Sequence, residues 1–174
     1  DALMRLRAEY LYSLRDYPSI RFNYTSGDTI RFSDWAVGIK PVVVKNKVSF
    51  TKAAKTSDYS YKNFRKYMRS IFYYAGTASL SRELKRQSIA NIKAGDVFIK
   101  GGFPGHAVFV VDVAKNVKTG KKIFLLAQSY MPAQSIHILR NFNQDNLSPW
   151  YPEDFGDKLK TPEWTFKKSS LKRF

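Results

Sequence analysis

His106 is the residue best suited to acid–base chemistry in this sequence. It follows the glycine-rich stretch from Gly101 to Gly105 and begins the most apolar segment of the chain. An imidazole titrates close to neutral pH, so a histidine at the end of a strand and beside a loop of small residues can act as a general base. The alternative is a half-buried structural histidine that hydrogen-bonds a loop carbonyl, and a single histidine does not decide between the two.

Gln128 is the candidate partner of His106. If the apolar segments on either side of Lys118-Thr119 form a hairpin, His106 lies opposite Tyr130, and Gln128 lies two residues along on the same face. The side-chain carbonyl of Gln128 would then hold the imidazole, whereas a register shift of one residue would present Ser129 instead. The alternative is that Gln128 and Ser129 only hydrogen-bond neighbouring backbone groups.

The composition excludes several other kinds of site. The sequence contains no cysteine and two histidines. Within these residues it therefore has no disulfide, no thiol nucleophile and no histidine-rich metal centre. It also lacks a phosphate-binding loop and a dinucleotide-binding glycine fingerprint. We expect no cofactor and no metal, and we expect His137, which alternates with Ile136 and Ile138, to be exposed.

The charge predicts a polyanionic partner. The 174 residues include 30 Lys and Arg against 14 Asp and Glu, a net charge of +16. Such a surface attracts nucleic acid, anionic glycans or anionic lipid surfaces over long distances. A basic stripe on one predicted helix favours phosphate contacts, yet any solvated helix has such a stripe. No nucleic-acid motif accompanies the charge, so we do not expect nucleic acid as the main partner. The stripe consists of Lys62, Arg65, Lys66 and Arg69.

Hydrophobic periodicity predicts the elements that position these residues. The first helix is expected to pack through Leu3, Leu6, Tyr10 and Leu14. Further expected elements are paired strands at 20–25 and 29–35, a loop with a short strand at 38–56, a helix at 59–74 capped by Ser57 or Asp58, and strands at 96–99, 107–113, 123–128 and 135–139. Strand 107–113 is expected to be buried on both faces, and the aromatic tail 142–174 to wrap around the rest.

These elements predict an α+β fold with a central antiparallel β-sheet packed with helices. The length of 174 residues fits a single domain, 1–174. No segment approaches the roughly 20 apolar residues that a transmembrane helix needs. The sequence does not determine the oligomeric state.

Several blocks of the sequence resemble an uncharacterised bacterial family known only as a domain of unknown function. The longest are Gly95 to Ile99, the Gly-Gly-Phe-Pro-Gly-His-Ala-Val motif that starts at Gly101, and the Leu-Leu-Ala-Gln-Ser-Tyr-Met-Pro-Ala-Gln motif that starts at Leu125. Shorter matching blocks are 4–10, 74–77, 149–151 and 161–164. The resemblance covers essentially the whole chain. It implies no reaction, because the family has no established activity.

A Gly-Asp strand followed by a Gly-His strand is similar to the core of the papain-like cell-wall peptidases of the NlpC/P60 and CHAP groups. In those enzymes a cysteine at the start of a helix attacks an amide, a histidine on the sheet is its base, and a polar residue on the next strand orients the histidine. The resemblance implies that His106 is the catalytic base and that Gln128 orients it. Backbone N–H groups of the glycine-rich loop could then face a developing oxyanion. The candidate binding residues are Gly102, Gly105, Ser129, Tyr130 and Trp35, of which Trp35 is either structural or part of a cleft.

The nucleophile has no match in the chain. The resemblance to the uncharacterised family implies a cysteine two residues before Asp1. Its spacing of four and seven residues from Leu3 and Leu6 would place it on their helix face and at the helix N-terminus, where the helix dipole lowers the pKa of a thiol. The chain is therefore expected to lack an upstream segment.

The leading hypothesis is a cysteine-dependent amide hydrolase or acyltransferase that is secreted or located in the bacterial cell envelope. The alternative is a non-catalytic basic module that binds an anionic glycan, a membrane surface or a protein, and the third hypothesis is nucleic-acid binding. The expected partner is peptidoglycan or another anionic envelope polymer.

Overall fold

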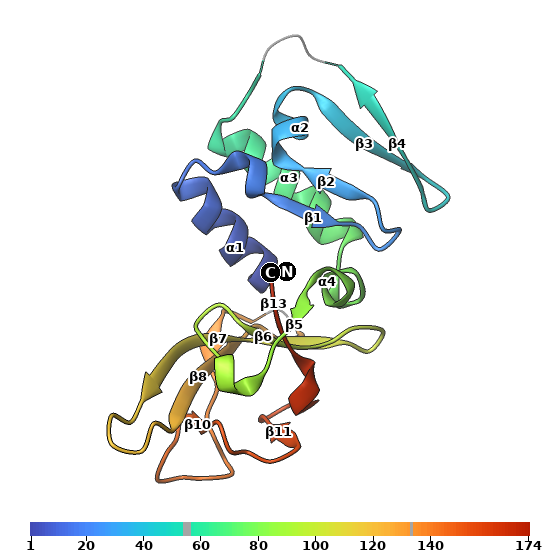
Figure 1. The fold of residues 1–174 in the computed structure, drawn as a ribbon. Helices are drawn as coiled ribbons and strands as arrows, with labels where there is room; N and C mark the ends of the chain where they lie inside the picture. Colours follow the sequence, from blue (N-terminus) through green and yellow to red (C-terminus); the bar gives the residue numbers. More distant parts are fainter. Residues whose placement is uncertain (54–56, 133) are drawn as a thin grey trace. The chain divides into compact units, whose positions relative to one another are not determined.

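The structure, a computed structural model, describes residues 1–53, 57–132 and 134–174 (Figure 1). The chain divides into two compact units, one of Asp1 with residues 3–80 and the other of Ala2 with residues 81–174. The expectation of a single domain stays a prediction. Among the described residues, no helix combines the length and the apolar character that crossing a bilayer requires.

The first unit combines helices with two β-hairpins. Its elements are α1 (Ala2–Ser13), η1 (Tyr17–Ser19), β1 (Arg21–Asn23), β2 (Thr29–Arg31), α2 (Phe32–Ala36), β3 (Ile39–Val44), β4 (Lys47–Lys52) and α3 (Tyr61–Tyr74). The predicted hairpin around Ser26-Gly27-Asp28 is confirmed, because β1 and β2 pair antiparallel. Its second strand is shorter than predicted, because the chain enters helix α2 at Phe32.

The buried face of α1 differs from the predicted one. Met4, Ala8 and Leu11 are buried, at the spacing of a single helix face. The exposed apolar side chains here are Leu6, Tyr10 and Leu14. The helix has two apolar stripes, and the exposed one includes a tyrosine, whose hydroxyl tolerates water. The predicted packed face is therefore wrong, and so is the argument that placed a nucleophile on it.

Residues expected as a loop form a second hairpin. β3 and β4 pair antiparallel around a two-residue turn at Lys45 and Asn46. Both turn residues have positive φ, 46° and 64°, as in the type I′ turns that match the twist of hairpin strands. The lysines of β4 interrupt the hydrophobic alternation, so the sequence pattern predicts only one short strand. Residues 54–56 of the expected loop lie outside the described residues.

Helix α3 begins at Tyr61, two residues later than predicted. Its N-cap is Ser60, whose hydroxyl accepts the backbone N–H of Asn63. Asp58, one of the two predicted caps, instead accepts the backbone N–H of Ser60. Hydrogen bonds from Ser60, through its side chain first and its backbone second, hold the pKa of the Asp58 carboxyl below its usual range. The apolar stripe predicted for this helix is buried at Phe64, Met68 and Ile71.

The second unit is built on a seven-stranded antiparallel sheet in the order β10-β8-β7-β6-β13-β5, with β9 paired to β8. Its strands are β5 (Lys85–Arg86), β6 (Val97–Lys100), β7 (His106–Lys115), β8 (Lys122–Gln128), β9 (His137–Ile138), β10 (Tyr151–Pro152) and β13 (Leu171–Arg173). β11 (Lys158–Lys160) and β12 (Thr165–Lys167) form a separate hairpin, and α4 (Thr77–Glu83), η2 (Ile89–Asn91) and η3 (Lys168–Ser170) complete the chain. The predicted α+β class with antiparallel pairing is confirmed.

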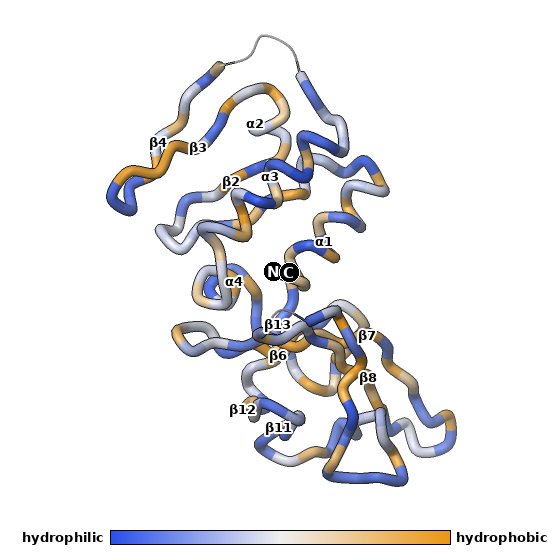
Figure 2. Tube along the Cα trace, turned by 180° about the vertical axis from the view of Figure 1, so that it is seen from behind, coloured by the Kyte–Doolittle hydropathy of each residue, from blue (hydrophilic) through white to orange (hydrophobic). Residues whose placement is uncertain are grey.

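The core of the second unit lies against one face of this sheet. Hydrophobic residues follow β6 and β8 (Figure 2), and Val108 and Val110 of β7 are buried among them. Leu159 and Phe166 of the β11–β12 hairpin cover this face. The intervening residues of β7 are half-buried or, like Val111, exposed. The expectation that strand 107–113 is buried on both faces is therefore wrong, because antiparallel sheets can leave one face partly solvated.

The C-terminal tail does more than pack aromatic rings. Its last strand, β13, lies between β6 and β5 in the sheet. Arg173 on this strand holds the fully buried carboxylate of Asp96 through Nε at 2.5 Å and Nη2 at 2.9 Å. The end of the chain therefore completes the sheet that carries the candidate site.

Candidate active site

Neighbouring strands bring His106 and Gln128 together. His106 is the first residue of β7 and Gln128 is the last residue of β8. Phe109 lies opposite Ala127, and this register, continued to the strand end, places His106 opposite Tyr130. The His106 and Tyr130 ring centroids are 5.1 Å apart. The register is the one predicted from the hairpin, so the alternative in which Gln128 bonds only backbone groups is not the arrangement observed.

A bulge in β7 determines which residue faces the imidazole. The pairing with β8 shifts by one residue between Val110 and Asp112. The register on the His106 side of the shift, continued along the strands, places Gln128 opposite Val108, which lies on the same face as His106. Had the register of the turn side continued, Ser129 would occupy this position instead. The extra residue in β7 therefore selects the glutamine.

Gln128 connects His106 to Glu163. His106 Nε2 lies 2.7 Å from Gln128 Oε1, and Gln128 Nε2 donates to Glu163 Oε2, also at 2.7 Å. His106 is 9% exposed and Gln128 is 1% exposed. Low exposure strengthens the hydrogen bond between His106 and Gln128, because water does not compete for these atoms. Glu163, at the other end of the chain of hydrogen bonds, is exposed.

The carboxylate of Glu163 fixes the proton on His106. An ionised carboxylate only accepts hydrogen bonds, so the amide nitrogen of Gln128 must face Glu163 and its oxygen must face His106. That oxygen also only accepts, so Nε2 of the imidazole carries a proton. In the neutral ring the lone pair is then on Nδ1, which has no hydrogen-bond partner among the described residues of its unit. This nitrogen is the one available for proton transfer.

Glu163 is the member of the site that the sequence reasoning missed. It lies in the loop between β11 and β12, where Thr161 donates its backbone N–H and its hydroxyl to the carbonyl of Trp164, each at 2.8 Å. This tight turn directs the carboxylate to the amide of Gln128. The available signal is the Thr-Pro-Glu-Trp block at 161–164, which matches the family without implying a role for Glu163.

Aromatic rings surround the imidazole. The ring centroid of Trp164 lies 5.5 Å from that of His106, and the ring of Phe166 lies 6.1 Å from it. Lys100 pairs with His106 across β6 and β7, and its ammonium is 5.5 Å from the Trp164 ring centroid. The rings restrict rotation of the imidazole, and the lysine supplies positive charge beside it.

The glycine-rich loop and Ser129 adjoin this group. Gly105 directly precedes His106, and Gly102 has a φ of 128°, a backbone conformation that favours glycine. Ser129 directly follows Gln128 and is half-buried. The binding roles expected for these residues and for Tyr130 stay predictions.

Trp35 and His137 have contacts of their own. Trp35 belongs to the first unit, where its Nε1 donates to Asn63 Oδ1 at 3.1 Å and the ammonium of Lys40 lies 4.3 Å from its ring centroid. His137 is exposed, as predicted, and its Nδ1 lies 3.0 Å from the carbonyl oxygen of Ser135. In the part of the chain that the structure describes, no three His, Asp or Glu residues gather as a metal site would require.

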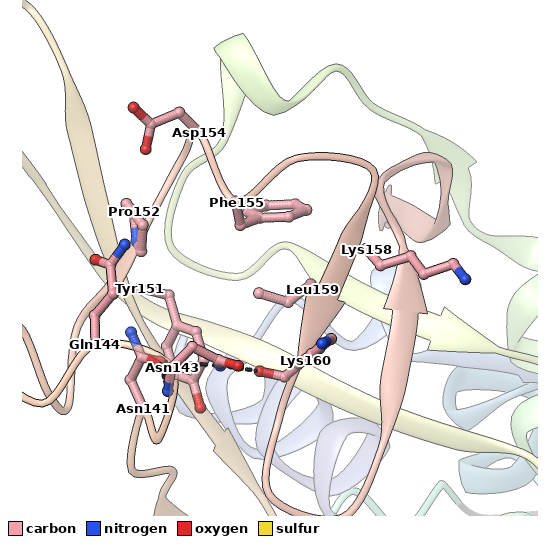
Figure 3. Close-up of a pocket in the computed structure, with 10 residues that line it drawn as sticks. All are labelled: Asn141, Asn143, Gln144, Tyr151, Pro152, Asp154, Phe155, Lys158, Leu159 and Lys160. Carbon is pink, nitrogen blue, oxygen red and sulfur yellow. Dashed lines mark hydrogen bonds between the residues drawn. The ribbon is translucent and has the colours of Figure 1, made fainter.

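A cavity of about 300 Å³ lies beside β10 and β11 (Figure 3). Asn143 spans part of its wall, because its amide donates to the carbonyl of Lys160 and to Oδ1 of Asn141. Tyr151 also lines the cavity, and burial, with the negative charge of Glu163 as the second cause, raises the pKa of its phenol well above the usual range. None of the site residues predicted from the sequence lines this cavity.

A family model described as a domain of unknown function (4846) matches residues 1–173. The chain belongs to this family. Membership agrees with the first resemblance drawn from the sequence, and it assigns no activity. No curated protein and no solved structure matches the chain, so the papain-like resemblance has no support from a known relative.

Proposed function

We propose that this member of the family is a cysteine-dependent amide hydrolase or acyltransferase in which His106 is the general base. The observation that carries the proposal is the pair of 2.7 Å hydrogen bonds from His106 to Gln128 and from Gln128 to Glu163. They hold the imidazole with its lone pair on Nδ1, as a general base requires. The arrangement of base and orienting amide is similar to that of the papain-like cell-wall peptidases.

The proposed reaction is acyl transfer through a thioester. Nδ1 of His106 removes the proton of a cysteine thiol, and the thiolate attacks the carbonyl carbon of an amide. Nδ1 then returns the proton to the departing amine, which leaves an acyl-enzyme. Water or a second amine attacks the thioester, gives its proton to Nδ1 and releases the acyl group, while the cysteine recovers its proton. Backbone N–H groups of the loop 101–105, apart from Pro104, which has none, are the proposed donors to the oxyanion.

The thiol must come from outside the 174 residues, which contain no cysteine. The resemblance to the uncharacterised family suggests a cysteine ahead of Asp1. We further propose that the substrate is an amide of the bacterial envelope, such as the peptide part of peptidoglycan.

The test is labelling of the full-length protein by an electrophilic thiol-acylating probe at neutral pH. We expect the labelling rate to fall by at least tenfold in His106→Ala, because general-base catalysis contributes about 10²–10⁴-fold. His137→Ala is the matched control and should react at the unchanged rate. Equal labelling of His106→Ala and the unmodified protein, or a full-length protein without cysteine, would overturn the proposal.

The second candidate is a non-catalytic binding module. It is favoured by the net charge of +16 together with the absence of a thiol in these residues. The same labelling experiment separates the two candidates, because a binding module predicts no dependence on His106.

A further inference from the structure

The first unit contains an unbalanced concentration of positive charge. Between Lys40 and Arg69 the sequence has nine Lys and Arg residues and one acidic residue, Asp58. Among the described residues of this segment, no lysine or arginine forms an ion pair with a carboxylate. Burial and, second, the charge of Lys66 lower the pKa of the Lys40 ammonium. The one carboxylate of this segment, Asp58, interacts with Lys40 and Lys66, and it cannot balance nine positive charges.

The β3–β4 hairpin adds apolar surface to this charge. Val42 and Val44 lie on the same face of β3 as Lys40, and Val44 pairs with Lys47 beside the turn. Val42 is 40% exposed and Val44 is 60% exposed. Figure 2 shows the hydrophobic stretch of β3 running into the hydrophilic turn of Lys45 to Lys47.

The opposite face of the hairpin is directed towards its own unit. Val43 and Val48, which pair with each other, line a cavity of about 220 Å³ together with Tyr24 and Tyr74. By the alternation of side chains along a strand, Val42 and Val44 point away from that cavity. The outer face of the hairpin thus exposes Val42, Val44 and Lys47 near the turn, with Ser49 opposite Val42.

We propose that this outer face docks on an anionic lipid bilayer. Lysines near an anionic membrane are attracted to its headgroups, and exposed aliphatic side chains gain free energy when they enter the region between headgroups and acyl chains. A phosphodiester backbone would use the lysines but not the valines, so the combination favours lipid over nucleic acid. The proposal does not depend on the acid–base chemistry of His106, which lies in the other unit.

The test is co-sedimentation of the chain with vesicles of phosphatidylcholine alone and of phosphatidylcholine mixed with phosphatidylglycerol. We expect binding to the mixed vesicles only, falling as salt is raised. Lys45→Gln with Lys47→Gln should weaken binding by more than tenfold, since each lysine near the surface is worth about fivefold. Val42→Ser with Val44→Ser should weaken it at unchanged net charge.

The turn between β7 and β8 provides matched controls. Val117 there is 96% exposed and Lys118 is exposed, so Val117→Ser and Lys118→Gln remove the same kinds of group from another hairpin. These controls should bind mixed vesicles as the unmodified chain does, and circular dichroism should show all variants folded. The proposal would be overturned if the chain did not bind mixed vesicles at low salt, or if the control variants weakened binding as much as the test variants. It would also be overturned if the valine variants bound vesicles normally and the chain bound a single-stranded oligonucleotide.

Discussion

At the residue scale, Gln128 determines what His106 can do. A carboxamide has one accepting and one donating end, so between an imidazole and a carboxylate it satisfies both neighbours in a single orientation. Hydrogen bonds of 2.7 Å on both sides show that this orientation is in place. A carboxylate in direct contact with His106 would place a negative charge beside the ring, whereas the amide oxygen accepts the hydrogen bond without adding a charge.

Gln128→Leu should destabilise the protein by about 1–3 kcal/mol, because it leaves the buried N–H of His106 without an acceptor. Urea unfolding followed by circular dichroism measures this cost. Gln144→Leu is the control, since Gln144 is exposed, and it should change the free energy of unfolding by less than about 0.5 kcal/mol. Equal costs for the two variants would show that the hydrogen bonds of Gln128 contribute nothing specific.

The bulge in β7 that selects Gln128 over Ser129 has no signal in the sequence. That one of these two residues faces His106 could be predicted from side-chain alternation and one hairpin turn. The contribution of Glu163 could not, because it lies 35 residues beyond Gln128 and reaches the site through a separate hairpin. No local pattern relates β8 to the β11–β12 turn.

At the element scale, the start of α3 depends on Ser60, which caps the helix, and on Asp58, which accepts the backbone N–H of Ser60. Ser60→Ala should cost about 1 kcal/mol, because it removes the acceptor for the N–H of Asn63. Thermal unfolding of Ser60→Ala and Ser57→Ala tests this. Ser57 is the control, because it is exposed and is a predicted cap that does not cap the helix. A larger loss in Ser57→Ala than in Ser60→Ala would contradict the observed cap.

Asp58 gives the same region a dependence on acid. Hydrogen bonds from Ser60 lower the pKa of its carboxyl in the folded protein. Its contribution to stability is therefore complete above the ordinary carboxyl pKa of about 4 and is lost as the pH falls through the lower folded value. As the pH falls through this range, the free energy of unfolding should decrease less in Asp58→Asn than in the unmodified protein. Unfolding measured at a series of pH values tests this. Identical acid profiles would show that Asp58 is not involved.

The second hairpin marks a limit of sequence patterns at this scale. Its turn residues, Lys45 and Asn46, adopt positive φ, but lysine is not typical of such turns. The pairing of β3 with β4 outweighs this local preference, and nothing in the composition of β4 reveals the pairing.

At the scale of the whole molecule, the end of the chain stabilises the sheet of the second unit. The strand order could not be predicted from the sequence. β13 pairs with β6, although the two strands are far apart in the sequence, and the residues of such short strands do not indicate which strands pair. The ion pair between buried Asp96 and half-buried Arg173 connects β13 to the residue that precedes β6.

Arg173→Leu should destabilise the second unit by about 3–5 kcal/mol, because it leaves the carboxylate of Asp96 buried without a counter-charge. Asp96→Asn combined with Arg173→Leu should recover part of this loss. Lys167→Leu, at an exposed position of β12, controls for the removal of one positive charge. Urea unfolding of the four proteins tests the claim, and a loss in Arg173→Leu no greater than in Lys167→Leu would contradict it.

The central claim is that Glu163, through Gln128, keeps the proton of His106 on Nε2 and the lone pair on Nδ1. The most direct measurement is the ¹⁵N chemical shifts of the His106 imidazole at neutral pH, with exposed His137 as an internal reference. We predict a protonated Nε2 and an unprotonated Nδ1, with the preference reduced in Glu163→Ala. A proton on Nδ1, or a tautomer ratio unaffected by Glu163→Ala, would contradict the account.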